Sequence, residues 1–349
     1  MFAALLLTHG LLLPAPSIGT DKLILRGRIG EGAHGDVLLG EVGGGRVAIK
    51  VGLRVGALDR EAEVLSALAG APGFPKLLHH EAEGASVGAP GGVLVMELLG
   101  PSLEDLCTRC VASQRTHFSA STVLRVGRGA LRRLRQLHKA GFVHNDIKPG
   151  NLLLGTGSAR QAAEMHLIDF GLTTRIFGDV VPALDTALPD APVGTPTFAS
   201  LAAHQRRRAM RPADDIEALV YTLAYLAAGE LPWQDESDSF AASLKWKMLA
   251  YGCDEVLTDG GGSLAEYVHS AEVAGVLRAL WAEVVRCRHD GSWWREGVNV
   301  DYDYDACLAA LQGEEDGVEA PLDWEAEPGV FGLWSLSKRL AEGLEGFSP

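Results

Sequence analysis

Two short segments carry residues whose types and spacing could do chemistry together. Residues 144–151 (H-N-D-I-K-P-G-N) place Asp146, Lys148 and Asn151 on one short loop, and Asp169 opens a D-F-G tripeptide after the apolar run 165–168, which is typical of a strand. Phosphoryl transfer needs such a set: a carboxylate that receives or orients a hydroxyl nucleophile, a cation near the γ-phosphate and two oxygen ligands for Mg²⁺. The sequence therefore predicts a phosphoryl-transfer site at these segments.

A glycine-rich string lies upstream of this pair. It has the pattern G-x-G-x-x-G and contains Gly30, Gly32 and Gly35, with Ile29 before it and Val37 after it. Dinucleotide-binding folds use the same string, but there a strand leads directly into a helix. Here two strands follow, the second ending V-A-I-K at Lys50, so we expect the glycines at a hairpin tip that can approach a triphosphate closely. Residues 43–45 are interpreted as a plain surface turn.

Lys50 needs a carboxylate partner to hold it beside the phosphates. The segment 58–68 has a helical composition, with Leu58, Leu65 and Leu68 at helical spacing. Glu61 and Glu63 point in different directions on such a helix, so only one can face Lys50. We expect Glu61 to do so and Glu63 to lie on the solvated face.

The second half of the chain is predicted to be mainly helical. Val93–Leu99 is typical of a buried strand, and the breaker Gly100-Pro101 after it is a candidate hinge between two lobes. Helical patterns follow at 102–110, 121–139, 214–230, 241–251 and 264–286. The helix at 121–139 carries five arginines that we interpret as a solvated face: Arg125, Arg128, Arg132, Arg133 and Arg135.

Composition excludes several classes of protein. The 349 residues are 47% hydrophobic and 22% charged, which is ordinary for a globular protein. The net charge of −14 disfavours binding to nucleic acid or an anionic membrane. Five cysteines without regular spacing indicate a reducing compartment, the cytoplasm or nucleus, rather than a disulfide framework. Cys107 and Cys110 form a C-x-x-C, but no second Cys or His pair nearby completes a zinc site.

The first 16 residues are apolar but make a poor export signal. No Lys or Arg precedes the apolar run, and His9-Gly10 interrupts it. The run is also shorter than the roughly 20 residues of a membrane span. We therefore expect no export and no membrane span.

The assembled pattern resembles the eukaryotic protein kinases, whose H-R-D-x-x-x-x-N and D-F-G elements match residues 144–151 and 169–171. It is similar more narrowly to the casein kinase 1 group, through residues 95–106 (V-M-E-L-L-G-P-S-L-E-D-L), 194–200 (G-T-P-T-F-A-S), 214–217 and 231–234. The vaccinia-related and tau-tubulin kinase branches are near alternatives, because N-D-I-K-P is not the usual casein kinase form.

The resemblance implies an α+β, bilobal protein kinase fold with a β-rich small lobe and a mainly helical large lobe. The domain would cover residues 20–312, with the small lobe at 20–99 and the large lobe at 100–312. Residues 1–19 would be an apolar extension, and 313–349 an acidic and then amphipathic tail, which we expect by default to pack on the large lobe. The implied activity is that of a monomeric serine/threonine protein kinase that uses ATP and Mg²⁺ on protein substrates.

The resemblance also implies a role for each site residue. Asp146 would be the catalytic base, Lys148 the γ-phosphate cation, and Thr195 the bridge between them. Asn151 and Asp169 would bind Mg²⁺. Lys50 and Glu61 would form the ion pair that positions ATP, and Asp215 would brace the catalytic loop through its backbone N–H groups. The nucleotide would contact the glycine loop (Ile29, Gly30, Gly32, Gly35, Val37), Ala48, the gatekeeper Met96, and the backbone of Glu97 and Leu99.

Two departures from the family pattern bear on regulation and substrate. Asn145 replaces the arginine that pairs with an activation-loop phosphate in many kinases, so we expect activity that does not require that phosphate. Thr197 stands where casein kinase 1 members have an arginine for primed or acidic substrates. Residues 172–193 carry three aspartates, Asp179, Asp185 and Asp190, and one cation, Arg175. A basic or neutral substrate site is therefore at least as plausible as an acidic or primed one.

Two other functions compete with this interpretation. A pseudokinase scaffold would be expected to lack Lys50, Asp146 or Asp169, and all three are present. A small-molecule kinase of related fold is disfavoured by the casein kinase-like segments at 95–106 and 194–200.

Overall fold

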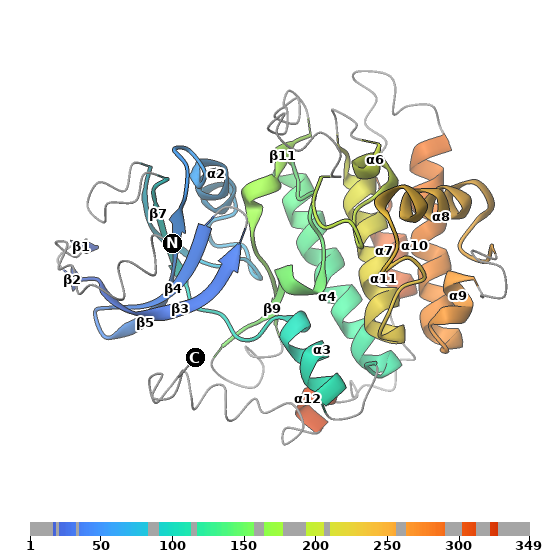
Figure 1. The fold of residues 1–349 in the computed structure, drawn as a ribbon, viewed down its shortest axis with the longest axis horizontal. Helices are drawn as coiled ribbons and strands as arrows, with labels where there is room; N and C mark the ends of the chain where they lie inside the picture. The colour runs from blue at the N-terminus through green and yellow to red at the C-terminus, as the bar shows by residue number, and fades with distance from the viewer. Residues whose placement is uncertain are drawn as a thin grey trace.

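The computed structural model describes residues 17–18, 21–32, 35–82, 91–112, 117–156, 164–176, 193–205, 210–255, 263–289, 302–311 and 322–326. These residues form two lobes, a small one built on a β-sheet and a larger one built mainly of helices (Figure 1). The α+β, bilobal architecture expected from the sequence is thereby confirmed. The predicted tail helix at 330–344 and the three aspartates at 179, 185 and 190 lie outside the described residues.

The small lobe contains a five-stranded antiparallel sheet in the order β3-β4-β5-β7-β6. Its strands are β3 (Ile24–Gly32), β4 (Gly35–Val42), β5 (Gly45–Gly52), β6 (Leu77–Glu81) and β7 (Val93–Glu97). Because side chains alternate along a strand, Val47 and Ile49 enter a small core on one face of the sheet. Ala48 and Lys50 point to the other face, toward the main core that joins the two lobes.

One helix, α2 (Asp59–Ala67), packs against this second face. Leu58, Leu65 and Leu68 are all buried, so the predicted apolar spacing is confirmed. The same helical phase turns Glu61 inward, where it is 2% exposed. The packing of the leucines thus determines where the partner of Lys50 lies.

The large lobe is arranged around two long helices, α4 and α7 (Figure 1). Its helices are α3 (Leu103–Ala112), α4 (Ala120–Lys139), α6 (Leu201–His204), α7 (Pro212–Ala228), α8 (Asp238–Tyr251), α9 (Leu264–Tyr267), α10 (Ala271–His289), α11 (Tyr304–Ala310) and α12 (Asp323–Ala326). Nearly every residue of α7 is buried, so this helix forms the centre of the lobe. No helix in the described part of the chain is long and apolar enough to cross a bilayer.

Short elements complete the fold: two lie before the small-lobe sheet, and the others lie between the helices near the site. They are β1 (Ser17–Ile18), β2 (Asp21–Lys22), β8 (Phe142–Val143), η1 (Pro149–Asn151), β9 (Leu152–Leu154), β10 (Met165–Leu167), η2 (Phe170–Leu172) and β11 (Thr174–Arg175). β9 pairs with β10, and β8 pairs with β11. These two antiparallel pairs hold the ends of the segments that carry the predicted catalytic residues.

A single helix at 264–286 is a wrong prediction. The chain forms α9 and α10 instead, separated at 268–270, where His269 has a left-handed backbone (φ 49°). Ser270 then accepts a hydrogen bond from the Val273 backbone N–H, as an N-terminal cap does. The apolar spacing continues through the break, which is why periodicity alone does not detect it.

The interpretation of the arginines on α4 as a solvated face holds for Arg132, which is exposed, but is wrong for Arg128, Arg133 and Arg135. Arg133 is buried and donates to the Pro72 carbonyl, and Arg128 donates to the Leu311 carbonyl at 3.0 Å. Arg135 pairs with Asp305 at 2.7 Å. Segments distant in the sequence cover this side of α4, so its arginines hold other elements in place.

Residues 322–326 of the predicted tail pack against the start of α4. The Asp323 carboxylate accepts a hydrogen bond from the Ser119 backbone N–H at 2.7 Å, and the Asp323 N–H donates to Thr122 Oγ1 at 2.9 Å. Trp324 is 2% exposed and packs edge-to-face on Phe118, with ring centroids 5.8 Å apart. The short helix α12 therefore completes the large lobe.

We expect Trp324→Ala to destabilise the protein by about 3–5 kcal/mol, because it leaves a cavity the size of an indole beside Phe118. Chemical denaturation measures the effect. Glu325→Ala, which truncates an exposed neighbour in the same helix, should cost less than about 1 kcal/mol. Equal stabilities for the two variants would show that α12 does not belong to the cooperative fold.

Cys107 and Cys110 lie on α3 as free thiols. The described residues include no group of three or more His, Cys, Asp and Glu side chains that could hold a metal ion. Burial, with smaller contributions from the neighbouring Cys110 and Glu104, raises the pKa of Cys107 to about 12. A thiol in this environment remains protonated at neutral pH.

Alkylation of Cys107 at pH 8 should therefore be roughly a thousandfold slower than that of an ordinary cysteine, because the thiolate is the reactive form. The rate should rise with pH up to about 12. Iodoacetamide labelling followed by tryptic mapping measures it, since cleavage after Arg109 separates the two cysteines. The unfolded chain in urea is the control and should react at the ordinary rate; equally fast labelling of the folded protein would contradict the expectation.

Candidate active site

The loop 144–151 is anchored on α7 by one buried carboxylate. Asp215, 1% exposed, accepts hydrogen bonds from the backbone N–H groups of His144 at 2.7 Å and Asn145 at 2.8 Å. Its Oδ2 also lies 2.8 Å from His138 Nε2 on α4. The loop is thereby fixed to the two central helices of the large lobe, which is the bracing expected of Asp215.

Asp146, Lys148 and Thr195 form one hydrogen-bonded group. Thr195 Oγ1 lies 2.8 Å from both Asp146 Oδ1 and Lys148 Nζ, and Lys148 Nζ lies 2.9 Å from Asp146 Oδ2. The backbone N–H of Thr195 also donates to Asp146 Oδ1 at 2.8 Å. Gly194 permits this approach, because a Cβ there would lie 2.5 Å from the Asn145 carbonyl oxygen, and its φ of +82° favours glycine.

Asn151 and Asp169 supply the oxygen atoms of the predicted metal site. The Asn151 amide nitrogen donates to the Asp146 carbonyl at 2.8 Å, which fixes the side chain and leaves Oδ1 as its acceptor atom. Asp169 is partly exposed and has a left-handed backbone (φ 65°) at the start of η2. An amide oxygen and a carboxylate are the hard ligands that Mg²⁺ prefers, so this donor set fits the ion.

Lys50 joins the small lobe to this site. Its Nζ lies 2.6 Å from Glu61 Oε2 and 2.7 Å from Asp169 Oδ1, so Glu61 and not Glu63 faces it, as expected. Burial alone would lower the pKa of Lys50, but the two carboxylates outweigh burial and raise it above its ordinary value. The ammonium group is therefore charged at physiological pH and links both lobes.

The glycines 30, 32 and 35 lie on the hairpin of β3 and β4, and Gly32 pairs with Gly35 at its tip. The expectation of a hairpin rather than a strand-to-helix turn is confirmed. Gly35 is required by the sheet itself, since a Cβ there would lie 2.0 Å from the Val51 carbonyl oxygen. Val37 follows on β4, opposite Gly30 and Lys50, and Ile29 is exposed on β3.

The predicted adenine site lies at the junction of the lobes. Ala48 and Met96 are register partners on β5 and β7 and are both 8% exposed. The Glu97 N–H donates to the Lys76 carbonyl at 2.9 Å, so its own carbonyl is the group that could accept from a ligand. Beyond the buried Leu99, Gly100 N–H donates to the Leu154 carbonyl at 2.8 Å, which ties the hinge to β9.

Asn145 has contacts that the sequence did not indicate. Its Nδ2 donates to the Leu172 carbonyl at 2.7 Å and lies 3.1 Å from Thr174 Oγ1, which binds the segment after Asp169 to the catalytic loop. Its backbone is left-handed (φ 71°), a conformation that asparagine tolerates better than most residues.

Glu63 is not simply solvated, and that expectation is wrong. It accepts hydrogen bonds from Arg60 and from Arg175 on β11. The start of the activation segment is therefore attached to α2 as well as to Asn145.

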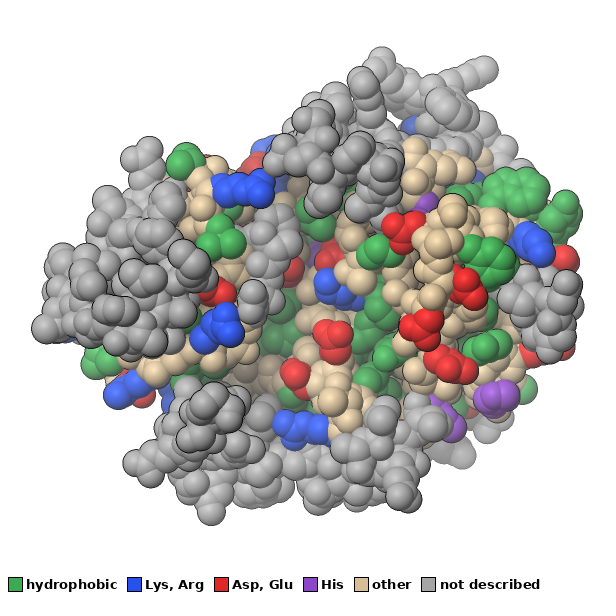
Figure 2. All heavy atoms as spheres, in the orientation of Figure 1, with side chains coloured by type: hydrophobic (Ala, Val, Ile, Leu, Met, Phe, Trp, Pro, Cys, Tyr) green, Lys and Arg blue, Asp and Glu red, His purple; other side chains and the backbone are tan. Residues whose placement is uncertain are grey.

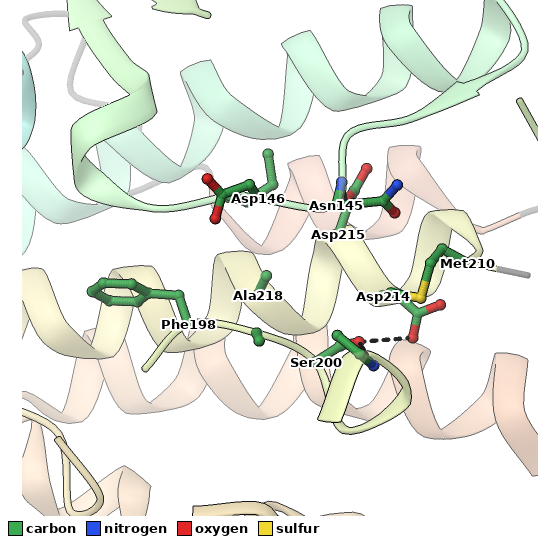
Figure 3. A pocket seen from close by; sticks show the side chains of 11 residues that line it. Asn145, Asp146, Phe198, Ser200, Met210, Asp214, Asp215 and Ala218 are labelled. Atoms are coloured by element: carbon green, nitrogen blue, oxygen red, sulfur yellow. Dashed lines mark hydrogen bonds between the residues drawn. The ribbon is translucent and has the colours of Figure 1, made fainter. Parts of the chain in front are cut away.

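Below the catalytic loop lies a cavity of about 10 Å³ (Figure 3). Its lining includes Asn145, Asp146, Phe198 and Asp214, and Ser200 donates to Asp214 across it at 3.2 Å. The volume suits about one water molecule, so neither a nucleotide nor a peptide fits there. On the face drawn in Figure 2, a hollow lies between the two lobes.

Acidic side chains gather on the large-lobe part of this face (Figure 2). The connection from α7 and the first turn of α8 contribute the exposed carboxylates Asp235, Glu236 and Asp238. The same connection contacts the segment after Thr195, because Trp233 Nε1 donates to the Thr197 carbonyl at 2.8 Å. Exposed carboxylates therefore follow directly in the chain after the residue that contacts Thr197.

Comparison with the models of known protein families matches residues 24–255 to the protein kinase domain. This range is more than half of the chain, and it begins with β3 and ends after α8. It includes the small-lobe sheet, the large lobe through α8, and the side chains of Lys50, Glu61, Asp146, Asp169 and Thr195. The chain therefore belongs to the protein kinase family.

Proposed function

We propose that this protein is an active serine/threonine protein kinase, similar to the casein kinase 1 group, that transfers the γ-phosphate of Mg-ATP to protein hydroxyls. The observation that carries the proposal is the continuous set of contacts from Glu61 through Lys50 to Asp169, beside the group of Asp146, Lys148 and Thr195. A scaffold protein that only binds partners does not need these charged side chains in contact with one another.

Each of these residues has a role that follows from its contacts. Asp146 accepts the proton of the substrate hydroxyl, with its carboxylate oriented by Thr195 and Asn151. Lys148 and Lys50 stabilise negative charge on the phosphates. When bound, Mg²⁺ would be held by Asn151 and Asp169 and would offset the charge that develops during transfer.

The preference for serine and threonine rests on the resemblance of residues 95–106 and 194–200 to the casein kinase 1 group. A preference for acidic substrates is not proposed, because Thr197 replaces the arginine of that group and the exposed carboxylates Asp235, Glu236 and Asp238 follow Trp233, which contacts Thr197. Like charges disfavour the approach of an acidic peptide, so basic or neutral sites are the better candidates.

Asp146→Asn and Lys50→Met should each lower protein phosphorylation about a hundredfold or more, because they remove the base and the phosphate cation. A radiolabel transfer assay with a mixed protein substrate measures this. Asp235→Asn and Lys247→Met make matched changes at exposed positions and should remain within about twofold of the wild type. Equal signals from all five proteins would reject the enzymatic function in favour of a scaffold.

We also propose that activity does not require phosphorylation of the activation segment. Asn145 and Glu63 hold residues 172–175 through uncharged and ionic contacts that involve no phosphate. Between Arg175 and Gly194 the sequence has one hydroxyl side chain, Thr186, so a single substitution tests the idea.

Thr186→Val and phosphatase treatment should each change kcat/KM less than about twofold, because no arginine stands at position 145 to bind a phosphate. Asn145→Gly, which removes the two donors without backbone strain, should lower kcat about tenfold. Steady-state assays on one substrate compare Thr186→Val, the phosphatase-treated protein and Asn145→Gly with the untreated wild type. Loss of most activity in Thr186→Val, with Asn145→Gly unaffected, would reverse the proposal.

A further inference from the structure

Lys245, on α8, is completely buried and has no role in the functions described above. Its exposed fraction is 0%, and it is among the largest buried side chains of the protein. Lysine is almost never buried to this degree unless its ammonium group is paired. Here the group meets backbone carbonyls of the segment that follows Thr195.

The contacts of Lys245 satisfy its donors. Nζ lies 2.8 Å from the carbonyl oxygens of Pro196 and Ala199 and 3.0 Å from His204 Nε2. An ammonium group has three N–H donors, which these acceptors take up. The Thr197 carbonyl also accepts from Nζ, at 3.2 Å, and it receives the indole N–H of Trp233 at 2.8 Å.

The surroundings of Nζ agree with this arrangement. Nζ lies 4.9 Å from the ring centroid of Tyr221 and 5.3 Å from that of Trp233, so aromatic faces support the cation. Burial and the charge of Lys245 lower the pKa of His204 to about 4, which keeps its ring neutral. Burial lowers the pKa of Lys245 itself to about 7, opposed by Glu217 and Asp238, and a neutral amine still donates two of these hydrogen bonds.

The carbonyls that Lys245 holds belong to one tight turn. The N–H groups of Phe198 and Ala199 both donate to the Thr195 carbonyl, at 3.0 and 2.8 Å. Thr195 is the residue that contacts Asp146 and Lys148, and Pro196 on the outer side of the turn is exposed. A peptide whose hydroxyl reaches Asp146 must therefore place its neighbouring residue against this turn.

We propose that Lys245 is a positioning residue for protein substrates, acting through the backbone of residues 196–199. This inference rests on the proposed kinase function, and it separates peptide binding from nucleotide binding. Lys245 contacts none of the residues predicted to hold ATP, so its loss should loosen the peptide surface and leave the nucleotide site intact.

The test compares Lys245→Met, which keeps the apolar stem and removes the donors, with Lys247→Met on the exposed side of the same helix. In Lys245→Met we expect kcat/KM for a peptide to fall at least about tenfold. The KM for ATP and the slow hydrolysis of ATP by water should stay within about twofold of the wild type. Lys245→Arg should recover part of the loss, and peptide libraries should show weaker selection at the position beside the phosphorylated residue.

Parallel losses of ATP hydrolysis and peptide phosphorylation would overturn the inference, because they would indicate a general structural role. Unchanged peptide kinetics in Lys245→Met would overturn it as well. If Lys245→Met does not fold, Trp233→Phe, which removes the donor to Thr197 and shortens the ring beside Lys245, should give a smaller loss of the same kind, and its absence would count against the inference.

Hydrogen exchange tests the positioning role of Lys245 separately from the proposed kinase function, because it does not depend on activity. Backbone amides of residues 198–201 should exchange faster in Lys245→Met than in Lys247→Met, whether or not the protein phosphorylates peptides. A wild type without kinase activity would refute the proposed function, whereas unchanged exchange would refute the positioning role alone.

Discussion

The site depends on one buried negative charge, the carboxylate of Asp215. A charge removed from water is stable only when hydrogen bonds surround it, and here two backbone N–H groups of the catalytic loop and His138 supply them. The same contacts satisfy backbone donors in a loop that has no regular partner strand. The loop and the carboxylate therefore stabilise each other, and neither could be buried alone.

The helix that carries Asp215 also anchors the other half of the site. Glu217, two residues along α7, accepts the Leu201 N–H at 2.8 Å and pairs with Arg288 of α10, while Asp214 accepts from Ser200 and from Arg288. The catalytic loop and the turn at 195–199 are thus both fixed to one rigid element. The short distances between Asp146 and Thr195 follow from this common support.

The sequence predicted the parts of the site that lie within a few residues of one another. The loop at 144–151 and Asp169 were recognisable because each motif is compact, and Glu61 could be chosen because helical phase separates it from Glu63. Lys245, Arg128 and Arg133 could not be foreseen, since their main partners are backbone carbonyls far away in the sequence. Every residue has a backbone carbonyl, so the amino-acid sequence does not indicate which carbonyl a buried lysine or arginine will bind. The break before α10 was missed for the related reason that a serine cap does not interrupt apolar spacing.

The packing of α12 sets an order for folding during synthesis. The small-lobe sheet is complete once residue 97 has been made, and its contacts are local. By contrast, the backbone N–H of Ser119, just before α4, donates to the carboxylate of Asp323, which lies 204 residues later in the chain. Since ribosomes make chains from the N-terminus, the small-lobe sheet can form early, whereas the contact between Phe118 and Trp324 forms only after most of the chain has been made. The large lobe of this kinase therefore gains its last described helix late in synthesis.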